Sequence, residues 1–179
     1  MNMPLTFTNP LQEAMTPELR RRIERAYREF PELTDRRVAV GITKRRGLDG
    51  YAVRKDFCIR LYVTRRTTPS FYTIGHELTH LLQKPGLGLI PNGEVQCDIW
   101  TLARSDLFLD ERPSYLRLSS YTEEDWPGHA RRVRELCQQA VKVRKTNRNY
   151  IVWLKDMLRQ NFGGPTQLCG TSGATAMGS

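Results

Sequence analysis

The sequence predicts one α+β domain, with a small antiparallel or mixed sheet and several helices. Two patterns indicate this class. Between residues 38 and 63, apolar and polar side chains alternate, as they do in strands with one buried face. Before and after this region, apolar residues recur at helical spacing. We expect one domain over 1–162, with its core at about 36–107, a helical C-terminal part at about 125–162 and a flexible tail at 163–179.

The first predicted helix begins after Thr16. Thr16 suits the N-cap and Pro17 the first helical position, and Pro31 ends the helix. The predicted strands cover 38–42, 51–53 and 57–63, with a turn at 47–50. Because each strand has one apolar face, we expect mainly antiparallel pairing.

Four further helices are predicted. One covers 71–83, after the start signal Thr67-Thr68-Pro69-Ser70, and Pro85-Gly86 ends it. The next covers 94–105, with Asn92 as its expected cap, and the segment 108–122 is irregular. The last two cover 127–145, after Asp125, and 148–161.

Composition and charge bear on whether the protein binds membranes, nucleic acid or acidic partners. The chain has no apolar run long enough for a membrane span and no N-terminal pattern of a signal peptide, so we expect a cytoplasmic protein. Its net charge of +9 could attract nucleic acid or an acidic partner. Aromatic residues do not alternate with the basic clusters, and no nucleic-acid motif is present. Nucleic acid therefore has no support from a motif.

The four cysteines do not form a zinc ribbon. Cys58, Cys97, Cys137 and Cys169 are far apart and include no CxxC pair. We interpret them as buried or free thiols in a reducing compartment.

The segment His76-Glu77-Leu78-Thr79-His80 predicts a zinc site with hydrolytic chemistry. Residues i and i+4 lie on one face of a helix, so both imidazoles can reach one ion. Glu77 can reach water beside the ion rather than the ion itself. Zinc lowers the pKa of such a water to about 7, and a carboxylate can then take its proton. We therefore predict His76 and His80 as ligands and Glu77 as the general base.

Catalytic zinc takes three protein ligands, so one is still to be found. Glu94 begins the next predicted helix and is our first choice. Asp98 lies one turn later and is expected to hydrogen-bond a ligating histidine. Asp98 itself and His129 are the alternative ligands.

On these residues the chain resembles the gluzincin metallopeptidases, in which ExxxD follows HExxH on a later helix. Glu94-Val95-Gln96-Cys97-Asp98 matches ExxxD, and the short chain is similar to the minigluzincins. The resemblance covers about residues 50–105. It implies a zincin-like fold and peptide-bond hydrolysis with zinc held by His76, His80 and Glu94. It also implies a substrate paired with an edge strand, for which we consider 57–63 or its neighbour. The metzincin pattern is absent, because Gln83 and Gly86 occupy its Gly and last His positions.

Two features of the gluzincin group are not assigned to single residues of this chain. The group uses a Tyr, His or Arg to stabilise the oxyanion, and Tyr121, His129 and several arginines are the candidates here. Some minigluzincins resemble latent forms whose C-terminal part blocks the cleft. Residues 106–179 are long enough for this, and Cys169 could reach the zinc.

Two other functions compete with the metalloendopeptidase hypothesis. One is a DNA-associated protease similar to the SprT-like class, which would use the basic residues between Arg131 and Lys145. That class expects a third histidine near the motif, and none is present. The other is a binding module with non-catalytic zinc. The sequence does not specify the substrate or the oligomeric state.

Overall fold

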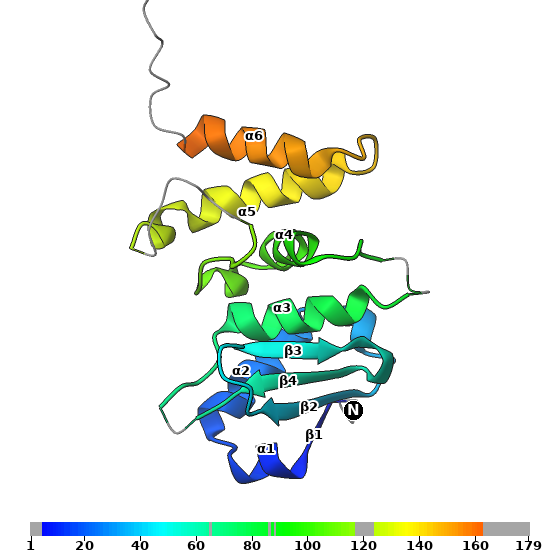
Figure 1. Cartoon of the computed structure of the whole chain (residues 1–179), viewed down its shortest axis with the longest axis vertical. Helices are drawn as coiled ribbons and strands as arrows, with labels where there is room; N and C mark the ends of the chain where they lie inside the picture. The colour runs from blue at the N-terminus through cyan, green and yellow to red at the C-terminus, as the bar shows by residue number, and fades with distance from the viewer. Residues whose placement is uncertain (1–4, 65, 86, 88, 117–123, 163–179) are drawn as a thin grey trace, which may run out of the picture.

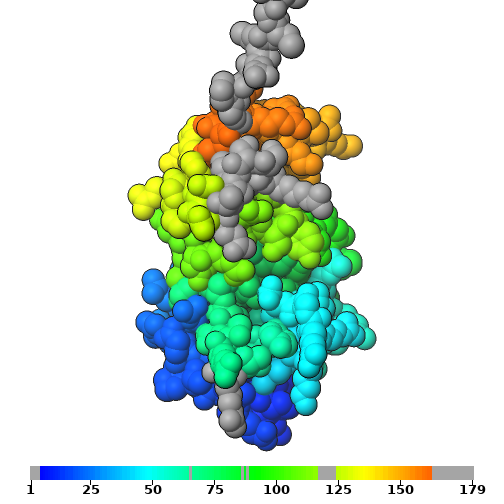
Figure 2. All heavy atoms as spheres, turned by 60° about the vertical axis from the view of Figure 1, so that its left-hand side comes forward, coloured from blue at the N-terminus to red at the C-terminus, as the bar shows by residue number. Residues whose placement is uncertain are grey.

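The computed structural model describes residues 5–64, 66–85, 87, 89–116 and 124–162. It has an α+β architecture in which a four-stranded mixed sheet lies at one end and a layered helical part at the other (Figure 1). The space-filling view places the C-terminal helices at the end of the molecule opposite to the sheet (Figure 2). Within the described ranges, no helix is long and apolar enough to cross a membrane.

The described part of the chain forms the following strands and helices. The strands are β1 (Leu5–Phe7), β2 (Val38–Thr43), β3 (Gly50–Val53) and β4 (Cys58–Tyr62). The helices are α1 (Asn9–Glu13), α2 (Pro17–Arg28), α3 (Phe71–Leu82), α4 (Glu94–Arg104), α5 (Trp126–Val143) and α6 (Tyr150–Phe162). Three short 3-10 helices are η1 (Pro31–Leu33), η2 (Arg54–Asp56) and η3 (Asp106–Leu109).

The sheet is mixed rather than mainly antiparallel. Its order is β1-β2-β4-β3, with β2 parallel to both β1 and β4, and β3 antiparallel to β4. The antiparallel part of our expectation therefore holds only for β3 and β4. Leu61 of β4 pairs with Ile42 on one side and Gly50 on the other, so β4 is an inner strand. The proposal that 57–63 is the substrate-pairing edge is wrong, and its neighbour β3 forms the edge beside α3.

Two apolar clusters hold the fold together. The first lies between the sheet, α2 and α3 and includes Ile59 and Ile74, both 0% exposed. The second joins α4, α5 and α6 and includes Ile99 and Leu136, also 0% exposed. Because α3 belongs to the first cluster and α4 to the second, the two helices that carry the predicted ligands meet where the clusters adjoin.

The predicted helix starts agree with the structure in two places. Thr16 Oγ1 accepts from the Leu19 backbone N–H at 3.1 Å, and Ser70 Oγ accepts from that of Thr73 at 2.9 Å. The expected cap at Asn92 is wrong. Gly93 precedes α4, and the Asn92 side chain instead accepts from Arg54 at 2.8 Å. The division into a core and a helical part stays a prediction, and residues 163–179 lie outside the described residues.

Candidate metal centre

Helix α3 brings His76, Glu77 and His80 to one end of a cleft. The helix is almost entirely buried, with His76 at 7% exposed and Glu77 at 6%. The Nε2 atoms of the two histidines lie 3.1 Å apart, as the i, i+4 spacing predicts for side chains on one face. Both imidazoles can therefore approach a common ion.

Glu94, the first residue of α4, places its carboxylate next to the Nε2 atoms of both histidines. Its Oε2 lies 3.2 Å from Nε2 of His76 and 3.0 Å from Nε2 of His80. The carboxylate side chain is 47% exposed, so it enters the cleft from the solvent side. Three potential ligand atoms thus form a triangle with sides of 3.0 to 3.2 Å.

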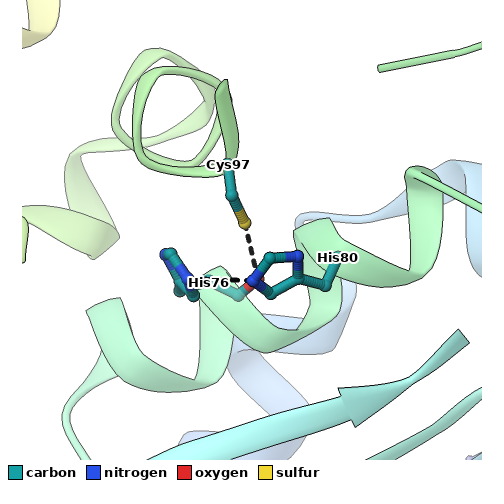
Figure 3. A group of neighbouring side chains, drawn as sticks. All are labelled: His76, His80 and Cys97. Atoms are coloured by element: carbon teal, nitrogen blue, oxygen red, sulfur yellow. Dashed lines mark hydrogen bonds between the residues drawn. The ribbon is translucent and has the colours of Figure 1, made fainter. Parts of the chain in front are cut away.

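A third buried group near the histidines is the thiol of Cys97, which we did not predict as part of the site. The ligand atoms of His76, His80 and Cys97 all lie within 4.8 Å of one another, so this group could hold a metal ion. In Figure 3 the thiol extends from α4 towards α3, where it donates a 3.0 Å hydrogen bond to the carbonyl oxygen of His76. Burial raises the pKa of the thiol to about 12, which opposes formation of the thiolate.

The Nδ1 atom of His76 faces a carboxylate. Asp98 is 0% exposed, and its Oδ1 lies 2.9 Å from Nδ1 of His76, an ion-pair distance at which the ring N–H is not well aligned. The hydroxyl of Tyr72 donates to the same oxygen at 2.6 Å. The backbone N–H groups of Tyr115 and Leu116 donate to Oδ2 at 2.8 and 2.6 Å. Because a carboxylate only accepts, Asp98 favours the proton on Nδ1 and leaves Nε2 as a lone pair.

Gln83 orients His80 in the same way. Its amide nitrogen donates to the carbonyl oxygens of Pro91 and Gly93 at 2.7 and 2.9 Å, so its Oε1 faces Nδ1 of His80 at 2.7 Å. This places a proton on Nδ1 and an unprotonated Nε2 towards Glu94. No sequence pattern predicts this role, since the contact depends on the tertiary packing that brings Pro91 and Gly93 against Gln83.

The acid–base directions follow from burial and from the close charges. Burial raises the pKa of the Glu77 carboxyl to about 7, with Glu94 and Asp49 adding to the rise. Burial and the neighbouring His76 lower the pKa of His80. Burial alone would lower the pKa of His76, but contacts with Asp98, Cys97 and Glu94 raise it. A proton and a cation are alternatives at these nitrogens, because a metal ligand must release its proton.

A cleft of about 480 Å³ opens in front of these residues. The 47–52 segment, which includes the start of β3, lines one part of it, and Glu111, Ser114 and Tyr115 line another. Oε2 of Glu77 is buried without a hydrogen-bond partner among the described residues. Gly50 makes room for this side chain, since a Cβ there would lie 2.9 Å from Cγ of Glu77.

Other predicted residues do not join the cleft. His129 lies on α5, where its ring packs against Phe162 at 5.1 Å, and it is not among the cleft residues. Tyr121 and Cys169 lie outside the described residues. Tyr115 lines the cleft and stacks on His76 at 5.9 Å, but it follows an irregular stretch and no sequence pattern pointed to it.

Comparisons with known proteins leave the family open. No family model, no curated protein and no solved structure matches this chain. The function is therefore inferred from the residues of the site.

Proposed function

We propose that the chain is a zinc-dependent metalloendopeptidase with a zincin-like fold, in which His76, His80 and Glu94 bind the ion. The observation that carries this proposal is the triangle formed by their ligand atoms. Ligand atoms about 2.0–2.1 Å from one tetrahedral zinc lie about 3.3 Å apart. The sides of 3.0 to 3.2 Å come close to that spacing. Three protein ligands leave one position for water or substrate, which is typical of catalytic zinc.

The protonation pattern also favours a cation. Gln83 and Asp98 direct the protons of His80 and His76 to Nδ1. Two nitrogen lone pairs and a carboxylate oxygen then converge, an arrangement that is repulsive unless a proton or a metal ion lies between them.

Cys97 is the competing third ligand, and its surroundings favour Glu94. Zinc binds the thiolate, whereas burial raises the pKa of this thiol to about 12. Its hydrogen bond to the carbonyl oxygen of His76 also stabilises the protonated form. We propose a structural role for Cys97, as a hydrogen-bonded contact between α4 and α3.

Glu77 and Tyr115 have separate roles in the proposed reaction. When bound, zinc acts as a Lewis acid that activates water and polarises the scissile carbonyl. Glu77 takes the proton from the attacking water and passes it to the leaving amine, and its unpartnered Oε2 and raised pKa suit both steps. Tyr115 lines the cleft beside His76, and its hydroxyl is the donor that we assign to the substrate oxygen.

The substrate is proposed to bind as an extended peptide along β3. This strand forms the sheet edge and its residues Gly50, Tyr51 and Ala52 line the cleft. A peptide can add to such an edge through backbone hydrogen bonds. No described residue of α5 or α6 lines the cleft, so latency would depend on other C-terminal residues and stays a prediction.

Cleavage of a peptide library by zinc-loaded wild type and by Glu77→Gln tests this function. We expect wild type to cleave internal peptide bonds, and Glu77→Gln to bind zinc equally well but to lose at least about a thousandfold in rate. Glu135→Gln, an exposed change on α5, is the control and should cleave normally. A zinc-loaded wild type that stays inert, also after removal of residues 163–179, would support the non-catalytic zinc module instead.

A further inference from the structure

The cleft has the opposite charge to the chain as a whole. The protein carries a net charge of +9. Among the described residues, the cleft is lined by the carboxylates of Asp49, Glu77, Glu94 and Glu111 and by one cationic side chain other than histidine, Arg54. The guanidinium of Arg54 already donates to Asn92 at 2.8 Å. The cleft is therefore an acidic site on a basic molecule.

Two of these carboxylates are accounted for by the proposed chemistry. Glu94 and Glu77 together balance the charge of a divalent ion. Asp49 and Glu111 remain, and neither forms an ion pair within the described part of the chain. Their negative charge is available to a ligand in the cleft.

The two remaining carboxylates come from different segments of the cleft lining, and the fold holds the backbone of Asp49 and the side chain of Glu111. Asp49 immediately precedes β3, and its carbonyl oxygen accepts from the Tyr62 backbone N–H at 2.8 Å. Glu111 is held at the N-terminus of α3 by the hydroxyls of Ser70 and Thr73. Both hydroxyls contact Oε2, and no described residue donates a hydrogen bond to Oε1 of Glu111.

The cleft lining also includes a buried carboxylate with an unfilled hydrogen-bonding atom. Glu77 is 6% exposed, and its Oε2 has no hydrogen-bond partner among the residues described. The carboxylates of Asp49 and Glu111 therefore line the same cleft as a buried oxygen that a bound molecule could contact, and they are not an isolated acidic patch.

We propose that the preferred substrate is a peptide with an arginine or lysine side chain beside the scissile bond, recognised by Asp49 and Glu111. This inference rests on the proposed peptidase function. A basic side chain would find a carboxylate from either segment, and charge-assisted hydrogen bonds between a cationic group and a carboxylate are stronger than neutral ones. An acidic side chain at the same place would meet like charges, which adds discrimination.

Matched fluorogenic peptides that differ at one residue beside the scissile bond test the proposal, with arginine, glutamine or glutamate at that place. We expect wild type to show a kcat/KM for the arginine peptide at least about tenfold above that for glutamine, with glutamate lowest. The preference should shrink as ionic strength rises. Asp49→Asn and Glu111→Gln keep the shape of each side chain and should reduce the arginine preference. The ratio of kcat/KM for the arginine peptide to that for the glutamine peptide is the readout, because Asp49 also adds to the raised pKa of Glu77 and its loss can change the rate for both peptides.

Glu135→Gln removes the same charge from the surface of α5 and should leave the preference intact. If wild type cleaves arginine and glutamine peptides equally, or if both cleft variants keep the wild-type preference, the basic specificity is overturned while the peptidase function stands. If zinc-loaded wild type cleaves none of the peptides and none of the wider library, the peptidase function fails and this inference fails with it.

Discussion

Asp98 lies against the side of His76 that faces away from Glu94, with its Oδ1 2.9 Å from Nδ1 of the imidazole. The same carboxylate accepts from Tyr72 and from the backbone of Tyr115 and Leu116. It therefore links the proposed ligand on α3 to the segment that forms a wall of the cleft.

Asp98→Asn should weaken zinc binding without removing a ligand. The amide cannot accept from all four groups that surround the carboxylate, so His76 loses its fixed orientation. We expect zinc affinity to fall about 10- to 100-fold, measured by competition with a chelator. Asp156→Asn on α6, where the acid is exposed and paired with Arg159, should bind zinc like wild type. Equal zinc affinities for the two variants would show that Asp98 does not support zinc binding by His76.

Tyr72→Phe should have a smaller effect of the same kind. It removes the 2.6 Å hydrogen bond to Oδ1 of Asp98 while keeping the buried ring. We expect zinc affinity to fall about three- to tenfold, because Asp98 becomes less restrained. Tyr27→Phe is the matched control, since it removes a 2.8 Å hydrogen bond to the Leu33 carbonyl oxygen in the sheet cluster. It should cost about 1 kcal/mol of stability and leave zinc affinity unchanged.

Gly50→Ala should separate catalysis from metal binding. The new Cβ would lie 2.9 Å from Cγ and 3.2 Å from Oε1 of Glu77 and would displace the proposed base. We expect kcat to fall about 10- to 100-fold with zinc content unchanged, because small misplacements of a reacting group are costly. Gly128→Ala, where a Cβ meets no atom within 4 Å, should keep full activity. Normal turnover in Gly50→Ala would show that Glu77 tolerates the shift.

Gly75→Ala tests how α3 packs on η3. Its Cβ would lie 2.6 Å from two carbons of the Phe108 ring, which is 0% exposed. Overpacking should lower the free energy of unfolding by about 1–3 kcal/mol, and the better helix propensity of alanine would recover only part of it. Chemical denaturation measures the change, and Gly128→Ala should not be destabilised. A Gly75→Ala protein as stable as wild type would contradict this packing.

Sequence patterns located the main elements because those elements have strong periodicity and clear end signals. Thr16 and Ser70 cap α2 and α3 as expected. The strand β1 and the helix α1 were not predicted, because three and five residues are too few for a periodic signal. Alternation shows that a strand has one buried face but not the direction of its neighbours, so the parallel pairing of β2 with β4 was missed.

The site was predictable where its residues follow a local spacing. His76 and His80 are one turn apart on α3, and Glu94 and Asp98 are one turn apart on α4, so each pair could be proposed from the sequence. Gln83, Cys97 and Tyr115 enter the site only through tertiary packing. Gln83 depends on the packing of Pro91 and Gly93 against it, and Tyr115 on the hydrogen bond of its backbone to Asp98.

We propose that Glu94, rather than Cys97, completes the metal site. Elemental analysis of purified wild type, Glu94→Ala and Cys97→Ala tests it most directly, with thermal unfolding to show that each protein is folded. We predict about one zinc per chain in wild type and in Cys97→Ala, and a large loss in Glu94→Ala. Full zinc in Glu94→Ala together with its loss in Cys97→Ala would contradict the proposed ligand set.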